Sequence, residues 1–152
     1  MLLKSEMPHF VALPLWPDDG LRRLELTADW IYKQWPDHNI LIEKGTVVNG
    51  ASIPRLFRNI YDPMGILFLA SIVHDKMFQD AWFYICDDDH KVLGRYYVTY
   101  EDANRIFEEI AHLSYPDESN AIELASFALR HGGRGTWDEC RERQDALING
   151  PK

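Results

Sequence analysis

The segment from Met64 to Gln79 most constrains the fold, because a helix formed by it is apolar on nearly every side. Its apolar residues are Ile66, Leu67, Phe68, Leu69, Ala70, Ile72, Val73, Met77 and Phe78. Such a helix has no face that favours water, so other elements must cover it all round. The chain has 152 residues, of which 46% are hydrophobic, and this suffices for one domain with an ordinary core. We therefore expect this helix at the centre of a single core.

The sequence before this helix favours strands. Residues 1–20 hold three prolines and a glycine, which predicts a loop-rich start with one short edge strand. Alternating apolar residues predict a strand within 21–35 and a second within 40–48, interrupted near Gly45. After the helix, residues 81–98 are typical of a hairpin or a loop. We expect two or three antiparallel strands before the central helix.

The remaining patterns favour helices. Pro54 begins a short helix that Ser52 can cap. Longer helices are predicted from about Tyr100 to Leu113, and from near Pro116 to the glycines at 132–133. The fold class is therefore α+β, with a small N-terminal antiparallel sheet followed by three to four helices and a central buried His-Asp helix. Residues 1–137 are expected to form this single domain, and residues 138–152 a charged, mobile C-terminal tail.

Two polar residues, His74 and Asp75, lie in the middle of the apolar helix. A buried charge without a partner is costly, and consecutive helical residues point about 100° apart, so each of the two needs its own partner. Asp102 begins the next predicted helix and can accept a hydrogen bond from His74 if the two helices pack antiparallel. Asp102 would then fix the tautomer of His74, whose other ring nitrogen would act as a general base.

Asp75 has a different candidate partner in the loop that precedes the helix. A carboxylate together with carbonyl oxygens from Asn49 and Gly50 forms the all-oxygen ligand set that a hard cation such as Ca²⁺ prefers. The catalytic hypothesis therefore has His74 and Asp102 as the catalytic pair and Ca²⁺ as the cofactor. Its metal ligands are Asp75, Asn49 and Gly50.

A structural interpretation of the same residues stays open. A lone buried histidine is usually a core residue whose hydrogen bonds are satisfied, which would explain His74 without chemistry. Asp102 follows Thr99 at nearly the spacing of a capping box, so it can serve only to start a helix. Asn49-Gly50 can be only a turn.

Four motifs in this order resemble a phage-associated family known as domain of unknown function 1353. They are Val47–Phe57, which contains Asn49-Gly50-Ala51-Ser52, then Ile72–Asp75, Glu101–Phe107 and Gly133–Trp137. The similarity spans roughly residues 25–137, and the family is widespread in phage and prophage genomes. The family typically has Asp-Gly-Ala-Ser in the first motif. Asn49 in place of this aspartate removes a charge from the loop.

The layout is also distantly similar to phospholipase A2, especially its small prokaryotic members. Those enzymes have a His-Asp pair on a buried helix, a preceding calcium loop, and a later helical aspartate that orients the histidine. The likeness implies the roles of water-activating base, calcium ligand and orienting carboxylate for His74, Asp75 and Asp102. It also implies that the loop at 49–50 supplies carbonyls to calcium. Phe78 departs from that layout, since the enzymes usually have tyrosine there.

The composition narrows the classes of function and location. The net charge of −8 argues against a general nucleic-acid binder and against tight adsorption on an anionic membrane. No apolar run reaches the roughly 20 residues that span a bilayer, and the N-terminus lacks the pattern of a signal peptide. We expect the protein in the bacterial host cytoplasm or in the phage virion.

Two main functions follow from these observations, besides a weaker third one as a host-interaction or counter-defence protein, with which the acidic charge is compatible. The first is a phage- or prophage-encoded metal-dependent hydrolase, which acts on a lipid or cell-envelope ester through the His-Asp centre. The second is a non-enzymatic virion or tail-assembly protein, with other phage tail or virion proteins as partners and a buried, structural His-Asp network. A solvent cleft at His74 would favour the first, and a sealed His74 would favour the second.

Overall fold

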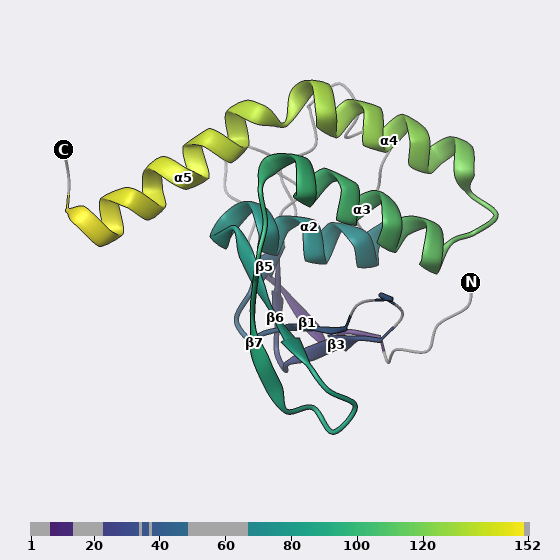
Figure 1. The fold of residues 1–152 in the computed structure, drawn as a ribbon, viewed down its shortest axis with the longest axis horizontal. Coiled ribbons are helices and arrows are strands. Elements are labelled where there is room, and N and C mark those ends of the chain that lie inside the picture. Colours follow the sequence, from purple (N-terminus) through teal and green to yellow (C-terminus); the bar gives the residue numbers. More distant parts are fainter. Residues whose placement is uncertain (1–6, 14–22, 34, 37, 49–66, 151–152) are drawn as a thin grey trace.

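The computed structural model describes residues 7–13, 23–33, 35–36, 38–48 and 67–150. Five strands come first in these residues, followed by a helix, two further strands and three more helices, and the strands form two small antiparallel sheets (Figure 1). The predicted α+β class with an N-terminal sheet is confirmed, although the strands divide between two sheets. The short helix predicted at Pro54, together with its cap Ser52, lies outside the described residues.

The first sheet has the strand order β1-β2-β5. Its strands are β1 (Phe10–Leu13), β2 (Arg23–Leu26) and β5 (Val47–Val48), all paired antiparallel. β1 lies at an edge, as the short edge strand predicted within residues 1–20. Leu24, Leu26 and Val48 are buried and join the hydrophobic core.

The second sheet has the strand order β3-β4-β6-β7. Its strands are β3 (Trp30–Tyr32), β4 (Asn39–Ile42), β6 (Trp82–Cys86) and β7 (Val92–Tyr97). The last two form an antiparallel hairpin, with Trp82 opposite Tyr97. This confirms the hairpin among the two alternatives for residues 81–98.

Each of the two strands predicted before the central helix is divided between the sheets. Gly45 explains the second division, because its φ of +90° is a turn conformation that glycine adopts readily. Its N–H donates to the carbonyl of Leu26 over 2.8 Å, which ends β4 and starts β5 in the other sheet. The side chain of Asp29 accepts a hydrogen bond from the N–H of Lys44 over 2.7 Å and so joins the two bends.

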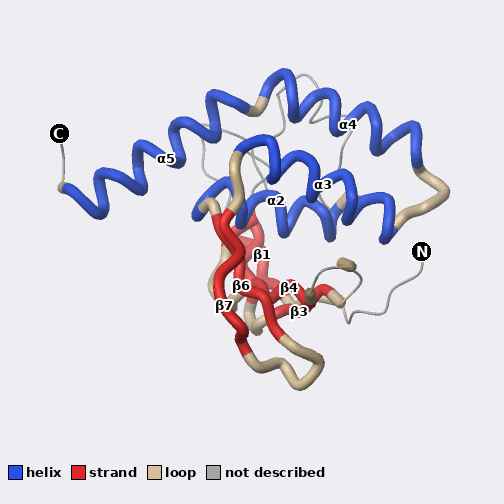
Figure 2. The backbone as a smooth tube through the Cα atoms, in the orientation of Figure 1, coloured by secondary structure: helices blue, strands red, loops and turns tan. Residues whose placement is uncertain are grey.

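The four described helices are α2 (Phe68–Asp80), α3 (Tyr100–Ser114), α4 (Ser119–Gly132) and α5 (Arg134–Asn149). Figure 2 shows α2 next to the strands, with α3 beside it and α4 beyond α3. The bounds predicted for the first three agree to within a few residues. No helix in the described part of the chain combines the length and the apolar character that crossing a membrane requires.

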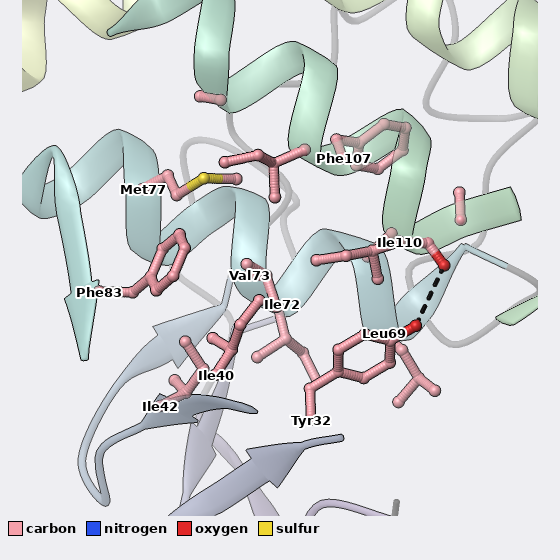
Figure 3. Close-up of a cluster of buried hydrophobic side chains, with 14 of the residues drawn as sticks. Tyr32, Ile40, Ile42, Leu69, Ile72, Val73, Met77, Phe83, Phe107 and Ile110 are labelled. Carbon is pink, nitrogen blue, oxygen red and sulfur yellow. Dashed lines mark hydrogen bonds between the residues drawn. The ribbon is translucent and has the colours of Figure 1, made fainter. Parts of the chain in front are cut away.

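Every residue of α2 from Phe68 to Phe78 is buried. Figure 3 shows side chains from three elements meeting along it. They are Tyr32, Ile40, Ile42 and Phe83 from the second sheet, Leu69, Ile72, Val73 and Met77 from α2, and Phe107 and Ile110 from α3. The hydroxyl of Tyr32 lies 2.9 Å from Oγ of Ser114, so the one polar atom of that ring is satisfied. The core is continuous from the sheet through α2 to α3.

Helix α5 is attached to the end of α2. Nη2 of Arg141 donates to the carbonyls of Phe78 and Gln79 over 2.5 and 2.9 Å, and Nε2 of Gln144 donates to the carbonyl of Asp80 over 2.9 Å. These donors satisfy carbonyls that a helix end leaves without partners. Residues 138–149, interpreted from the sequence as a charged tail, are therefore helical and continue the structure beyond Trp137.

Candidate functional site

His74 lies on the face of α2 that packs against α3, and only 1% of its surface is exposed. Its Nε2 atom is 3.0 Å from Oδ1 of Asn104 on α3. Its ring centroid is 4.3 Å from that of Phe78 and 5.3 Å from that of Phe107. The imidazole lies in a buried position, where it contacts Asn104 and two aromatic rings.

The surroundings of His74 favour its neutral form. Burial lowers the pKa of His74 to about 4, and the hydrogen bond to Asn104 offsets only part of this effect. A neutral imidazole carries one proton, and the carbonyl oxygen of Asn104 places that proton on Nε2. An amide has no charge with which to stabilise an imidazolium, whereas a catalytic carboxylate does so.

Asp102 does not reach His74. Its Oδ2 accepts a hydrogen bond from the N–H of Thr99 over 3.0 Å, and its own N–H donates to Oγ1 of Thr99 over 3.1 Å. Both contacts form a capping box at the start of α3, and the hydrogen bond from the N–H of Thr99 to the carboxylate also lowers the pKa of Asp102. The predicted hydrogen bond between His74 and Asp102 is therefore wrong. The capping alternative for Asp102 is confirmed.

Asn104 occupies the position that we expected Asp102 to fill. α3 begins at Tyr100, so Asp102 lies in its first turn, where its side chain reaches back to the cap. Asn104 precedes Phe107 by three residues and therefore shares the buried face of the helix. Its Nδ2 atom is buried and has no hydrogen-bond partner among the described residues. This periodicity was the sequence signal that would have identified Asn104.

Asp75 is buried as well, although its neighbour His74 faces α3. Burial of the Cys140 thiol on α5 raises its pKa, and the negative charge of Asp75 is a smaller cause in the same direction. Asp75 therefore lies within electrostatic reach of α5, and it makes at least one further interaction. His74 and Asp75 are therefore adjacent on α2 but have different surroundings, since His74 faces α3 and Asp75 lies near Cys140 of α5.

The predicted calcium site is only partly within the described residues. Asn49 and Gly50, two of its three ligands, lie outside them. Among the residues that the structure describes, no three side chains of His, Cys, Asp or Glu are grouped closely enough to hold a metal ion. The assignment of Asp75, Asn49 and Gly50 to calcium stays a prediction.

Lys76 is a third polar residue of α2 that sequence reasoning missed. It is buried, and its Nζ lies 2.9 Å from Oε2 of Glu43 and also contacts the carboxylate of Asp80. The ammonium lies 3.9 Å from the centroid of the Trp82 ring, within the range of a cation–π interaction. Lys76 therefore joins α2 to both β6 and the segment after β4. A lysine inside an apolar helix was the signal for such a pairing.

The region that carries these contacts matches a known family. A sequence model of the family described as "Protein of unknown function (DUF1353)" matches residues 24–116, more than half of the chain. The chain belongs to this family. The DUF1353 region starts in β2 and ends just after α3, so it includes His74 and Asn104 and leaves out α4 and α5. Searches among curated proteins and among solved structures found no match.

Proposed function

We propose that this DUF1353 protein works by assembly and not by catalysis, as a non-enzymatic component of a phage virion or of tail assembly. The observation that carries the proposal is the contact between His74 and Asn104. A neutral amide faces a neutral imidazole inside a closed core, and this arrangement suits a structural polar pair. The phage setting comes from the family resemblance given above.

The alternative hypothesis, a metal-dependent hydrolase, needs two features at His74. A general base must reach the proton that it removes, and a partner carboxylate must stabilise the charge that it gains. His74 is buried against Phe78 and Phe107. The carboxylate of Asp102, which was expected to orient it, accepts a hydrogen bond from the N–H of Thr99 instead. Both observations support the structural role of His74 over the catalytic one.

Two asparagines in the region of the predicted site support the same proposal. The resemblance to phospholipase A2 implies a carboxylate at the orienting position, and the α3 side chain that Nε2 of His74 contacts is the amide of Asn104. Asn49 likewise replaces the aspartate typical of the family in the preceding loop. Two positions where a catalytic site would use carboxylates therefore carry amides, which cannot serve as charged ligands or charged partners.

A direct test combines location with chemistry. The tagged full-length chain would be expressed in cells producing the phage that encodes it, and particles would be separated on a density gradient. We expect the chain in virion or tail-assembly fractions, and we expect His74→Gln to leave this distribution unchanged. Absence from every particle and assembly fraction would contradict the proposal.

The chemical arm uses phospholipid and ester substrates with the purified chain, in the presence of CaCl₂ or of EDTA. We expect no turnover and the same melting temperature in both conditions. Turnover that requires Ca²⁺ and is lost in both His74→Gln and Asp75→Asn would establish the hydrolase instead. Arg143→Gln is a suitable control, because Arg143 is exposed on α5.

A further inference from the structure

A pocket of about 230 Å³ lies among the strands and loops of the molecule. Its described lining comes from three separate segments: residues 7–9 before β1, residues 29–31 and 33 at β3, and His90 between β6 and β7. Figure 2 shows the strands and the loop between β6 and β7 extending away from the helices. None of these lining residues belongs to a helix, so the site, which we call the β3 pocket, is distinct from the contact between His74 and Asn104.

The wall that β3 contributes has opposite charges at its two ends. The first and last residues of β3 are buried in the core, so Ile31 between them points to the opposite face of the sheet. Asp29 precedes β3 and Lys33 follows it, and both line the pocket. Oδ1 of Asp29 already accepts a hydrogen bond from the N–H of Lys44. The wall therefore runs from a carboxylate through an apolar middle to an ammonium.

His90 belongs to the same end of the pocket as Lys33. The strand register places the last residues of β3 level with the end of β6, where the loop that contains His90 begins. Burial and the charge of Asp87 raise the pKa of the Cys86 thiol, and the ammonium of Lys33 partly opposes this rise. Lys33 is therefore within electrostatic reach of the last residue of β6, and two hydrogen-bond donors share this end of the pocket.

The backbone of His90 has a conformation that most residues avoid, with a φ of +66° in the left-handed region. Oδ1 of Asp87 fixes the loop, because it accepts the N–H groups of Asp89 and Lys91 over 2.9 Å each. Glycine would adopt this φ without strain, and the chain instead has an imidazole that lines the pocket. A side chain kept where glycine is favoured indicates a role for that side chain.

The charges that line the pocket are mainly positive or able to become so. The basic side chains are those of His9, Lys33 and His90, against one carboxylate. The neighbouring Asp88 contacts a different partner, since its Oδ1 accepts a hydrogen bond from Nδ2 of Asn39 over 3.0 Å. This local balance is opposite in sign to the net charge of −8 of the whole chain. It favours an anionic ligand.

We propose that the β3 pocket binds a small organic carboxylate, with its charged group at Lys33 and His90 and its apolar part along Ile31. Ammonium and imidazole N–H groups donate charge-assisted hydrogen bonds to a carboxylate. Met7 and Pro8 add apolar contacts for the body of the ligand. The volume is below the roughly 300–1,000 Å³ of sites for drug-sized molecules, so the ligand is a small one. The inference uses none of the residues that carry the assembly role.

A ligand with one negative charge suits this pocket better than one with two. A phosphate group carries a charge of about −1.5 to −2 at neutral pH. The pocket also holds the carboxylate of Asp29, which repels each added negative charge. The singly charged carboxylate group is therefore favoured, and phosphate serves as the comparison in the experiment.

Isothermal titration calorimetry with the full chain tests the class of ligand. The probes are hexanoate, its neutral analogue hexanamide, the cation hexylammonium, and inorganic phosphate. We expect hexanoate to bind at least about tenfold more tightly than each of the others, with NMR shifts of backbone amides concentrated at residues 29–33 and His90. No binding of hexanoate, or equal binding of any other probe, would overturn the inference.

Charge variants at the two ends of β3 should have opposite effects on hexanoate. Lys33→Gln is expected to weaken binding at least about tenfold, because it removes the ammonium. Asp29→Asn should strengthen binding, since it removes a negative charge and keeps an acceptor for the N–H of Lys44. Lys44→Gln is the control, because its side chain is exposed and outside the described lining. Weaker binding in Asp29→Asn would contradict an anionic ligand.

His90→Gly separates binding from stability. Glycine adopts the left-handed backbone more readily, so the melting temperature should not fall, whereas hexanoate binding should weaken at least about fivefold. His38→Gln is the control, since His38 is exposed and outside the described lining, and it should change neither quantity. Full affinity in His90→Gly would exclude His90 from the site and overturn the inference.

Discussion

Nε2 of His74 and Oδ1 of Asn104 lie 3.0 Å apart, and both side chains are buried between α2 and α3. The pair contributes polar atoms to a core that is mainly apolar. Buried polar groups stabilise a fold only when they keep their hydrogen bonds, so each residue of the pair depends on the other.

Replacing His74 by alanine is expected to destabilise the protein by about 2–4 kcal/mol, because it opens a cavity beside two aromatic rings and removes the partner of Asn104. Urea unfolding followed by tryptophan fluorescence measures the loss. His38→Ala is the control, since His38 is exposed, and it should change the free energy of unfolding by less than about 0.5 kcal/mol. Equal stability of the two variants would contradict the structural role.

Stability should fall as the pH drops from 6.5 to 4. Burial lowers the pKa of His74 from 6.5 to about 4, so the unfolded chain binds a proton in this interval that the folded chain does not. The loss reaches about 3 kcal/mol near pH 4 and is absent above pH 6.5. Urea unfolding at a series of pH values measures the slope. His74→Gln, which cannot titrate, should remove most of it.

Asn104→Asp should raise the pKa of His74 well above 4. The new carboxylate would lie within hydrogen-bond distance of the imidazole and would stabilise its charged form. NMR titration of the histidine ring measures the change. Asp102→Asn is the matched control: it weakens the capping box by roughly 0.5–2 kcal/mol and should leave the pKa of His74 where it is. The reverse result would restore Asp102 as the partner of His74.

Gly133→Ala should destabilise the junction of α4 and α5 by about 1–3 kcal/mol. A Cβ atom at Gly133 would lie 2.7 Å from the carbonyl oxygen of Leu129, a backbone atom with little freedom to move. Gly135→Ala is the control, because a Cβ there meets open space within α5, and it should be neutral or stabilising by up to about 1 kcal/mol. Thermal unfolding of both variants measures the difference. An equal loss of stability in Gly135→Ala would contradict the proposed clash at Gly133.

The helices were predictable from the sequence because their periodic patterns are long. The central helix and α3 were expected close to where they lie, since a run of apolar residues and a clear amphipathic face mark them. The strands were less predictable. A strand pattern of a few residues does not reveal which sheet it joins, and the turn at Gly45 sends β4 and β5 to different sheets. The many charged residues of α5 concealed the few positions by which it contacts α2.

The candidate site was predictable only in part. His74 and Asp75 were identified because polar residues in an apolar helix need partners. The partner of His74 was misplaced by two residues, since a carboxylate was sought and Asp102 supplied one. Asn104 went unnoticed because an amide offers no charge to pair, although its spacing from Phe107 places it on the buried face.

The contacts of α5 with the end of α2 determine when the chain can finish folding during its synthesis. Arg141 follows Phe78 by 63 residues, so a ribosome adding about 5–20 residues per second needs about 3–13 seconds to supply it. During this interval the last carbonyls of α2 lack the hydrogen bonds that Arg141 and Gln144 donate in the folded chain. A ribosome that stalls within α4 would present a nascent chain with an open helix end, to which chaperones and proteases have access.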